Sequence, residues 1–248
     1  MNCRIALLCL AIAGCAHAPG GKDATILSAG AVEPGLVAAL TQFEKETGKR
    51  AAVTFNTAPQ VRERITKGDR FDIVIVPPAM MDGFAREGRV GSERVTLGSV
   101  GQGVAVRDGA PVPDVSSVEA MKRTLLAADA VVFNRATGGQ YIESMLKKIG
   151  VYGDIERKTV RYDSAAQVME HLIKSERRDI GFGPLPEITM YTKKGVHLVA
   201  PLPAEVQQRN AYVASAMGDA ANAETAAALL RFLATPQAKA ALAAGGVD

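Results

Sequence analysis

The sequence predicts an α/β protein built on doubly wound parallel sheets. From residue 24 onward, short apolar segments alternate with segments of helical periodicity, which is the pattern of βαβ units. One apolar run, "FDIVIVP" at 71–77, is continuous, as expected of a central strand covered on both faces. Helical segments such as 34–48 and 59–68 begin with proline and end with glycine, which marks their limits.

The expected elements follow one another without a low-complexity linker or an internal repeat. In the first half, we expect strands at 24–30, 52–55, 71–77 and 101–107 and helices at 34–48, 59–68 and 83–90. In the second half, we expect strands at 131–133, 158–162, 179–185, 196–203 and 212–217, and helices at 116–127, 142–149 and 163–176, before a terminal helical pair at 222–247. Ser116 and Glu119 have the spacing of a capping box for the helix at 116–127.

Composition excludes some classes of partner. The chain has 248 residues and a net charge of +3, spread without a basic stripe, so nucleic-acid binding has no electrostatic support. All three cysteines lie within the first 15 residues, which leaves the body of the chain without CxxC redox or zinc motifs.

The first 23 residues read as a signal segment with a short tether. A basic residue, Arg4, precedes an apolar run at 5–13 that is too short to span a bilayer but suits a secretory signal. Two processing sites compete. "IAGC" at 12–15 resembles a bacterial lipobox, in which Cys15 is acylated, whereas Ala16-His17-Ala18 has the form of an ordinary cleavage site but precedes Pro19. Either site predicts export to the periplasm.

Four places along the chain share one design, in which a strand end and small residues precede a helix. Small side chains let backbone N–H groups approach a ligand, and each helix N-terminus favours negative charge. In open α/β sheets, ligands bind beyond the carboxyl ends of the strands. We therefore predict that these four places bind a small anion, although ordinary helix capping would explain each one singly. The predicted binding residues are Ser28, Gly30, Ala31, Thr57, Ala58, Thr137, Gly138, Gly139, Ser164 and Ala165.

Catalysis has little support in the sequence. Nucleophile-elbow, metalloprotease and phosphate-loop motifs are missing, and no pair of carboxylates stands out. His171 and His197 are better explained as packed or surface residues, and Arg62, Arg135 and Arg161 as surface charges that could each reach a ligand carboxylate. We expect no enzymatic activity, no catalytic residue, no metal and no cofactor.

The chain resembles a known family in three segments. "TILSAGAVEPGLVAALTQFEKETGKRAAVTF", "RITKGDRFDIVIVP" and "ALLRFLATPQAKAALAAGG" are similar to bacterial periplasmic solute-binding proteins of the type II class. Within that class, the chain looks most like the molybdate-binding component of ATP-driven (ABC) importers and its divergent relatives. The resemblance extends from about residue 24 to about residue 246.

The resemblance implies a fold of two lobes joined by two hinge crossovers. One lobe would comprise 24–104 plus 200–248, and the other 105–199. It also implies a monomer that closes on a molybdate-like oxyanion and docks on membrane permease subunits.

Departures from the family pattern weaken the assignment of the ligand. Ala31 stands where the family has a serine, Thr57-Ala58 where it tends to have consecutive serines, and Pro184 where it has a ligand-bonding tyrosine. A small organic carboxylate therefore competes with molybdate as the ligand. A sensing or docking lipoprotein that is not coupled to transport is a third possibility.

Overall fold

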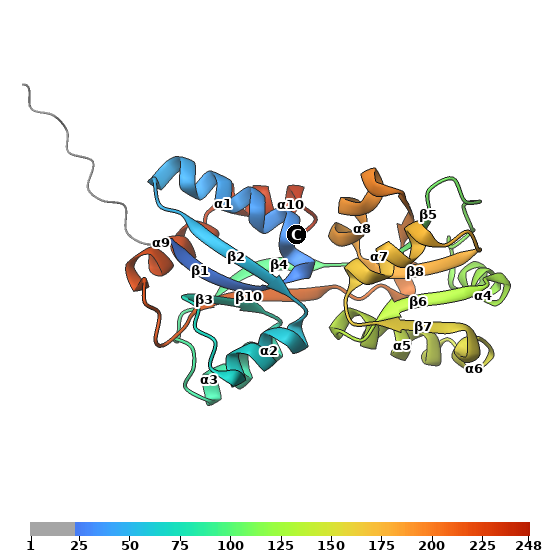
Figure 1. Cartoon of the computed structure of the whole chain (residues 1–248), viewed down its shortest axis with the longest axis horizontal. Coiled ribbons are helices and arrows are strands. Elements are labelled where there is room, and N and C mark those ends of the chain that lie inside the picture. The colour runs from blue at the N-terminus through green and yellow to red at the C-terminus, as the bar shows by residue number, and fades with distance from the viewer. Residues whose placement is uncertain (1–22) are drawn as a thin grey trace, which may run out of the picture.

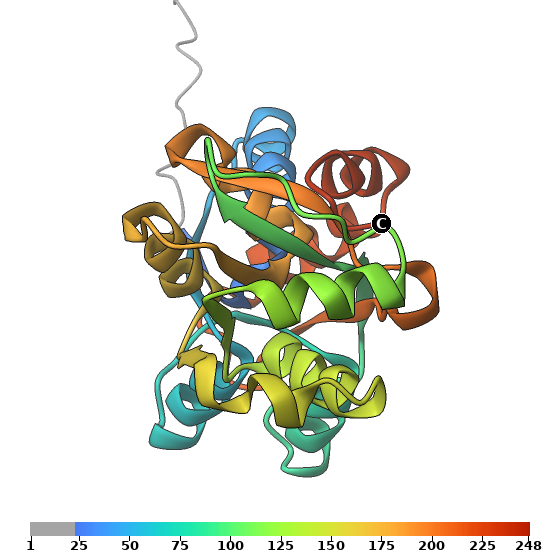
Figure 2. The same cartoon turned by 90° about the vertical axis from the view of Figure 1, so that its right-hand side faces the viewer.

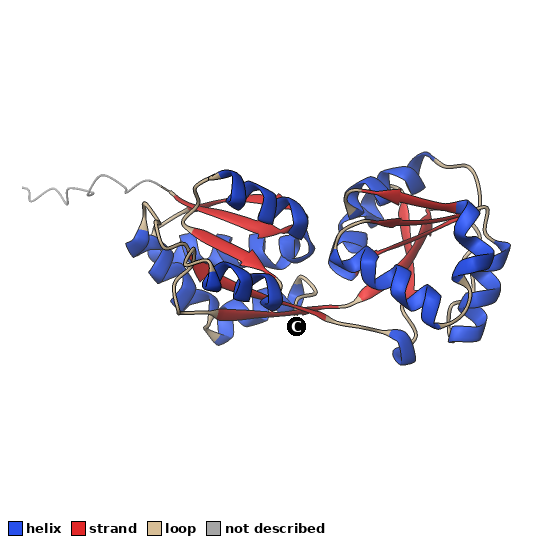
Figure 3. Ribbon diagram, turned by 90° about the horizontal axis from the view of Figure 1, so that it is seen from below, coloured by secondary structure: helices blue, strands red, loops and turns tan. Residues whose placement is uncertain are grey.

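The computed structural model describes residues 23–248, which form two lobes placed end to end along the long axis (Figure 1). Two extended segments join the lobes on one side, and the ribbons separate above them (Figure 3). Viewed from the end of the second lobe, the two lobes lie one behind the other (Figure 2). The fold is thus the two-lobed α/β fold that the sequence predicts.

The first lobe is built on a five-stranded sheet of order β2-β1-β3-β10-β4. β1, β2 and β3 run parallel, whereas β10 is antiparallel to both β3 and β4. The strands are β1 (Ala24–Ala29), β2 (Ala51–Asn56), β3 (Ile73–Val76), β4 (Val95–Val100) and β10 (Asn210–Ala216). Its helices are α1 (Glu33–Thr47), α2 (Ala58–Lys67), α3 (Pro78–Arg86), α9 (Ala223–Leu233) and α10 (Pro236–Ala244), with a 3-10 turn η1 (Gly30–Val32) before α1.

The second lobe repeats this arrangement with the order β7-β6-β8-β5-β9. β6, β7 and β8 run parallel, and β5 is antiparallel to β8 and β9. The strands are β5 (Gln102–Arg107), β6 (Ala130–Asn134), β7 (Thr159–Tyr162), β8 (Asp179–Pro184) and β9 (Val196–Pro201). The helices are α4 (Val118–Ala127), α5 (Thr137–Lys148), α6 (Tyr152–Ile155), α7 (Ala165–Lys174) and α8 (Leu185–Tyr191), with 3-10 turns η2 (Glu156–Lys158), η3 (Thr192–Lys194) and η4 (Ala204–Val206).

Each sheet is buried on both faces, which explains the continuous apolar strands. β3 lies at the centre of its sheet and all four of its residues are buried, as are the five residues of β6. Ile73 and Ile75 face the core beneath α1, α9 and α10, whereas Val74 and Val76 face the core beneath α2 and α3. The second sheet likewise packs against two separate cores. Two layers of helix on each sheet give the doubly wound arrangement.

The two crossings between the lobes are hydrogen-bonded to each other. The chain leaves the first sheet after Val100, enters the second at Gln102, and returns between Pro201 and Asn210. Gln102 N–H donates to Gln207 Oε1 at 2.9 Å, and Gln207 Nε2 donates to Gln102 O at 2.8 Å. The first crossing therefore lies slightly before the expected lobe boundary at 104–105.

Several details differ from the sequence-based expectation. The helix α8 was not expected, and α3 lies at Pro78–Arg86 where a helix was expected at 83–90. The sheets are mixed and not wholly parallel, because β10 and β5 run back from the crossings against their neighbours. The strand β4 was not expected. Ser117, and not Ser116, caps α4, accepting from Ala120 N–H at 3.2 Å. Finally, α5 begins at Thr137, so Gly138 and Gly139 belong to its first turn and not to a loop before it.

Cys15, the expected lipidation site, and the rest of the expected signal segment to residue 22 lie outside the described residues. Over 23–248, none of the helices combines the length and apolarity needed to cross a bilayer.

Gly139 marks the closest approach of α5 to the strand before it. A Cβ atom at this position would lie 1.8 Å from Asn134 O. We expect Gly139→Ala to lower the free energy of unfolding by about 3 kcal/mol, because backbone atoms must move apart to admit the methyl group. Urea unfolding measures the change. Gly153→Ala in α6 is the matched control, since a Cβ there meets nothing within 4 Å. Equal stability of the two variants would contradict the packing described.

Candidate functional site

A cavity of about 580 Å³ lies between the lobes and is lined by residues of both. The chain reaches it at the carboxyl ends of the parallel strands β1, β2, β6, β7 and β8. Because ligands of open α/β sheets bind beyond these strand ends, this cavity is the candidate binding site.

The wall contributed by the first lobe consists of small residues followed by helices. Gly30 and Ala31 begin the 3-10 turn that leads into α1, and Thr57 and Ala58 begin α2. The Thr57 N–H donates to Gln60 Oε1 at 3.0 Å, which fixes the start of α2. The absence of bulky side chains brings the backbone of both turns to the cavity surface.

The facing wall in the second lobe begins with α5. The Asn134 side chain, buried at the end of β6, accepts from Ala136 N–H at 2.9 Å and from Gly139 N–H at 3.2 Å. The N–H groups of Thr137 and Gly138 lie between these two bonded groups, in residues that line the cavity. This first turn therefore offers backbone donors beside a side chain that already caps the helix.

The start of α7 completes this wall. Ser164 Oγ accepts from Gln167 N–H at 3.3 Å, and the Gln167 side chain accepts in return from Ser164 N–H at 3.1 Å. The hydroxyl of Ser164 is thus engaged in a capping box. The carboxylate of Asp163 pairs with Arg135 at 3.3 Å, and both side chains are largely exposed.

The structure places most of the predicted binding residues at this cavity. Gly30, Ala31, Thr57, Ala58, Thr137, Gly138, Ser164 and Ala165 line it. Ser28 does not, because its fully buried hydroxyl donates to Ala29 O at 3.1 Å. Gly139 does not line it either, since it packs on Asn134. Contact of any of these residues with a ligand stays a prediction.

Several cavity residues were missed by the sequence reasoning. Gln102 is only 2% exposed, and its Oε1 has no hydrogen-bond partner within residues 23–248. A Cβ on Gly138 would lie 3.2 Å from its amide group, which places that amide against the start of α5. Tyr212, Glu33 and Glu187 also line the cavity. The sequence gives no sign of these residues, because they lie within strands or helices and only the folded chain brings them to the cavity.

Glu187 on α8 is the most unusual of these groups. Its Oε1 lies against Gly30, where a Cβ would stand 3.0 Å away, and its Oε2 is buried without a hydrogen-bond partner in the described part of the chain. Burial, with a smaller contribution from the charge on Glu33, raises the pKa of the Glu187 carboxyl to about 7. Burial likewise raises the pKa of Glu33, although the charge on Lys194 opposes this shift.

Positive charge is sparse at the cavity. Among the residues that line it, Lys194 is the one cationic side chain. Two of the arginines that sequence reasoning considered are engaged elsewhere: Arg62 pairs with Glu87, and Arg161 pairs with Glu143 over the ring of Phe133. Anion binding here would therefore depend on backbone N–H groups and amide side chains.

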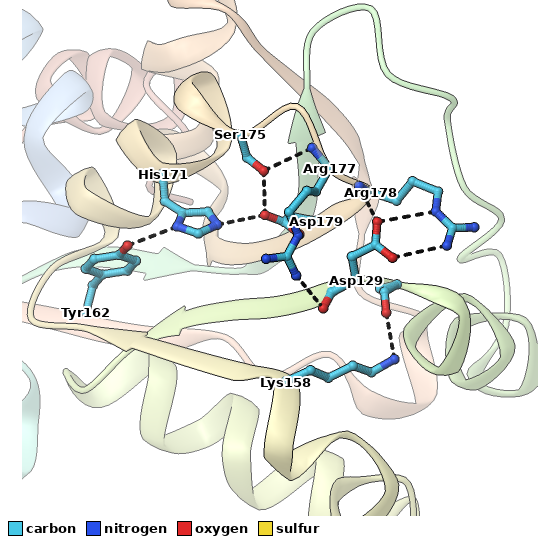
Figure 4. Close-up of polar contacts among 9 residues, drawn as sticks. Asp129, Lys158, Tyr162, His171, Ser175, Arg177, Arg178 and Asp179 are labelled. Atoms are coloured by element: carbon cyan, nitrogen blue, oxygen red, sulfur yellow. Dashed lines mark hydrogen bonds and ion pairs between the residues drawn. The ribbon is translucent and has the colours of Figure 1, made fainter.

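A second polar cluster lies in the second lobe, at the far end of α7 (Figure 4). His171 bonds to the Tyr162 hydroxyl at 2.9 Å and to Asp179 Oδ2 at 2.9 Å, and Ser175 Oγ donates to the same Asp179 oxygen at 2.6 Å. These bonds tie α7 to β7 and β8, which identifies His171 as a packed residue. Within residues 23–248, no set of three or more His, Cys, Asp or Glu side chains is arranged to hold a metal ion.

The sequence model of the bacterial extracellular solute-binding proteins matches residues 24–248. The chain belongs to this family.

Individual relatives span most of the chain. An aconitate isomerase from a Pseudomonas species is 28% identical over 229 residues, which cover 90% of this chain and 86% of the relative. The periplasmic molybdate-binding protein of Azotobacter vinelandii superposes with a TM-score of 0.75 at 16% identity, covering 91% of this chain and 99% of that one. Peb3, a Campylobacter jejuni protein, superposes in its L-phospholactate-bound form with a TM-score of 0.69 at 12% identity, covering 90% of this chain and 98% of that one. At these identities the two structures support the fold alone.

Glu187 is half-buried and its Oε2 atom is fully buried, which predicts a pH-dependent stability. The unfolded chain loses this proton near its ordinary pKa of 4.5, whereas the folded chain holds it to about pH 7. The stabilising contribution is present at low pH and is lost as the pH rises through this window, a change of about 3 kcal/mol. We expect Glu187→Gln to remove this decline in urea unfolding between pH 5 and 8. Glu170→Gln, at an exposed position of the same cavity, should retain it. Parallel curves for wild type and Glu187→Gln would contradict the shift.

Proposed function

We propose that this chain is an exported binding protein that captures a small organic acid between its two lobes and delivers it to an ABC importer. The observation that carries the proposal is the convergence of four strand-to-helix turns on one interlobe cavity. Backbone N–H groups at helix starts favour acid groups without requiring a cationic side chain. Ser164, Ala165, Gly138, Thr57 and their neighbours are the proposed contacts.

Three features favour an organic acid over a tetrahedral oxyanion such as molybdate. A cavity of about 580 Å³ is in the range that holds small organic molecules. At the turns that line it, Ala31 and Ala58 carry no hydroxyl, and the hydroxyls of Thr57 and Ser164 cap their own helices, which leaves the hydroxyl of Thr137. The relative named aconitate isomerase takes its name from an organic acid. Molybdate and related oxyanions are the alternative ligands.

The cellular setting is part of the same proposal. We place the protein in the periplasm, anchored through lipid on Cys15, with cleavage after Ala18 as the alternative. It would act as a monomer whose two lobes, joined by the crossings between Val100 and Gln102 and between Pro201 and Asn210, close on the ligand and then present it to the permease subunits. A sensing or docking role without transport uses the same cavity and differs only in the partner.

A thermal-shift screen tests the ligand class. At a hundred times its dissociation constant, a ligand stabilises the protein by about 2.7 kcal/mol, which raises the Tm of a chain of this size by roughly 5–10 °C. We expect a shift with aconitate and other small carboxylates, and a smaller one or none with molybdate, tungstate, sulfate and phosphate. Shifts confined to molybdate and tungstate would contradict the organic-acid proposal.

A variant of α5 tests the position of the site. Gly138→Val adds bulk against the Gln102 amide, 3.2 Å away, and fills the cavity wall. We expect it to abolish the carboxylate-induced shift while the ligand-free Tm changes little. Ser144→Val, at an exposed position of the same helix, is the matched control and should bind normally. Unchanged binding by Gly138→Val would place the site elsewhere.

A second candidate function is catalysis of a proton shift in the bound acid. The relative named aconitate isomerase covers 90% of the chain, and Glu187 supplies a buried carboxyl whose pKa of about 7 suits acid–base work near neutrality. In such a step, Glu187 would take a proton from a carbon beside a carboxylate, the double bond would move, and the proton would return to another carbon of the same molecule. No oxidant or reductant is required.

Proton NMR of aconitate in D₂O tests this second candidate. An active protein would convert one isomer into the other and introduce deuterium, and Glu187→Gln would slow both by about 100-fold or more. Glu170→Gln should remain as active as wild type. A spectrum that stays unchanged over days at micromolar protein would restrict the function to binding.

A further inference from the structure

The cavity holds two buried oxygens that lack hydrogen-bond donors within residues 23–248. One is Oε1 of Gln102, a side chain only 2% exposed, and the other is Oε2 of Glu187. Buried polar atoms are nearly always bonded, so each of these two points to a group that the cavity is built to receive. Gln102 can satisfy an acid oxygen by turning its amide, which exchanges its oxygen for an N–H₂ group. Glu187 has no such freedom, because it donates only when it is protonated.

The charges around Glu187 make its protonation state decisive for an acidic ligand. Glu33 on α1 faces the same space and repels a second negative charge. An ionised acid brought beside ionised Glu187 would add a third negative charge, at a point where Oε1 of Glu187 lies against Gly30. The other titratable groups of the cavity near this point are Tyr212 on β10, Tyr191 on α8, Lys194 in the following turn, and Glu170 on α7. Of these, only Lys194 carries a positive charge, and it offsets the charge on Glu33.

We propose that Glu187 and a carboxylate of the bound acid share one proton. Glu187 is then a specificity-determining residue, which admits the anions of weak acids and rejects the anions of strong acids. The inference rests on the proposed function, since it concerns the ligand of the same cavity. Two carboxyl groups in contact cannot both be ionised, so one proton between them turns repulsion into a charge-assisted hydrogen bond. Sulfate, the anion of a strong acid, is a poor partner for such a proton.

Isothermal titration calorimetry with aconitate as the probe measures this proton directly. At pH 8 a free carboxylic acid is fully ionised, so any proton taken up on binding goes to the protein–ligand contact. Titrations in two buffers of different ionisation enthalpy give the number of protons bound. We expect close to one proton for wild type at pH 8 and an affinity that falls up to about tenfold for each pH unit above 7.

Two variants separate the contact from a general effect of charge. Glu187→Gln keeps the shape of the side chain, and its amide N–H₂ group can donate a hydrogen bond without taking up a proton. We therefore expect this variant to bind aconitate with no proton uptake and with an affinity that does not depend on pH above 7. Glu176→Gln removes an exposed charge of the same lobe that does not line the cavity, and it should behave as wild type. Ligand-free melting curves of both variants confirm that they are folded.

The outcomes distinguish the inference from the function on which it rests. If aconitate binds to wild type and Glu187→Gln with the same proton uptake, the inference is wrong and the organic-acid function stands. If aconitate does not bind at any pH while molybdate does, the proposed function is wrong, and the inference fails with it. Tight binding of sulfate to wild type at pH 8 would also overturn the selectivity.

Discussion

The structure depends on one constraint: the parallel strands of both sheets point their carboxyl ends at the gap between the lobes. β1 and β2 end there from one side, and β6, β7 and β8 end there from the other. Each strand end must turn into a helix within a few residues, so the starts of α1, α2, α5, α7 and α8 are brought to the same space. Helix N-termini and small turn residues follow from this topology, and with them a cavity that favours acid groups.

Side chains of the protein already bond some of the N–H groups at these helix starts. Asn134 and Ser164 cap α5 and α7, and the Thr57 N–H is bonded to Gln60. What remains for a ligand is a limited set of backbone donors and the Gln102 amide. Because α8 carries Glu187 into the gap and places its Oε1 against Gly30, the cavity combines backbone N–H groups that favour anions with a carboxyl group whose Oε2 is buried. This combination favours a ligand that is acidic and can also share a proton.

The sequence predicted the local elements well and the cavity only in part. Strand β3 and the limits of α1 and α2, which have proline near the start and glycine at the end, leave strong local signals of periodicity and punctuation. Glu187 leaves none, because a glutamate after proline in a short helix looks like a surface residue, and its burial arises from packing against the other lobe. Gln102 is likewise an ordinary strand residue until the crossing places it beside Gly138. Strands β5 and β10 were expected, but their antiparallel direction was not, since strand direction depends on the whole topology.

A crystal structure of the protein soaked with aconitate would test the central claim most directly. The account predicts the ligand between the lobes, with one carboxylate within hydrogen-bond distance of the backbone N–H groups of Thr137 and Gly138 and another acid group at Glu187. Density for aconitate outside this cavity, or within it but away from both the helix starts and Glu187, would contradict the account.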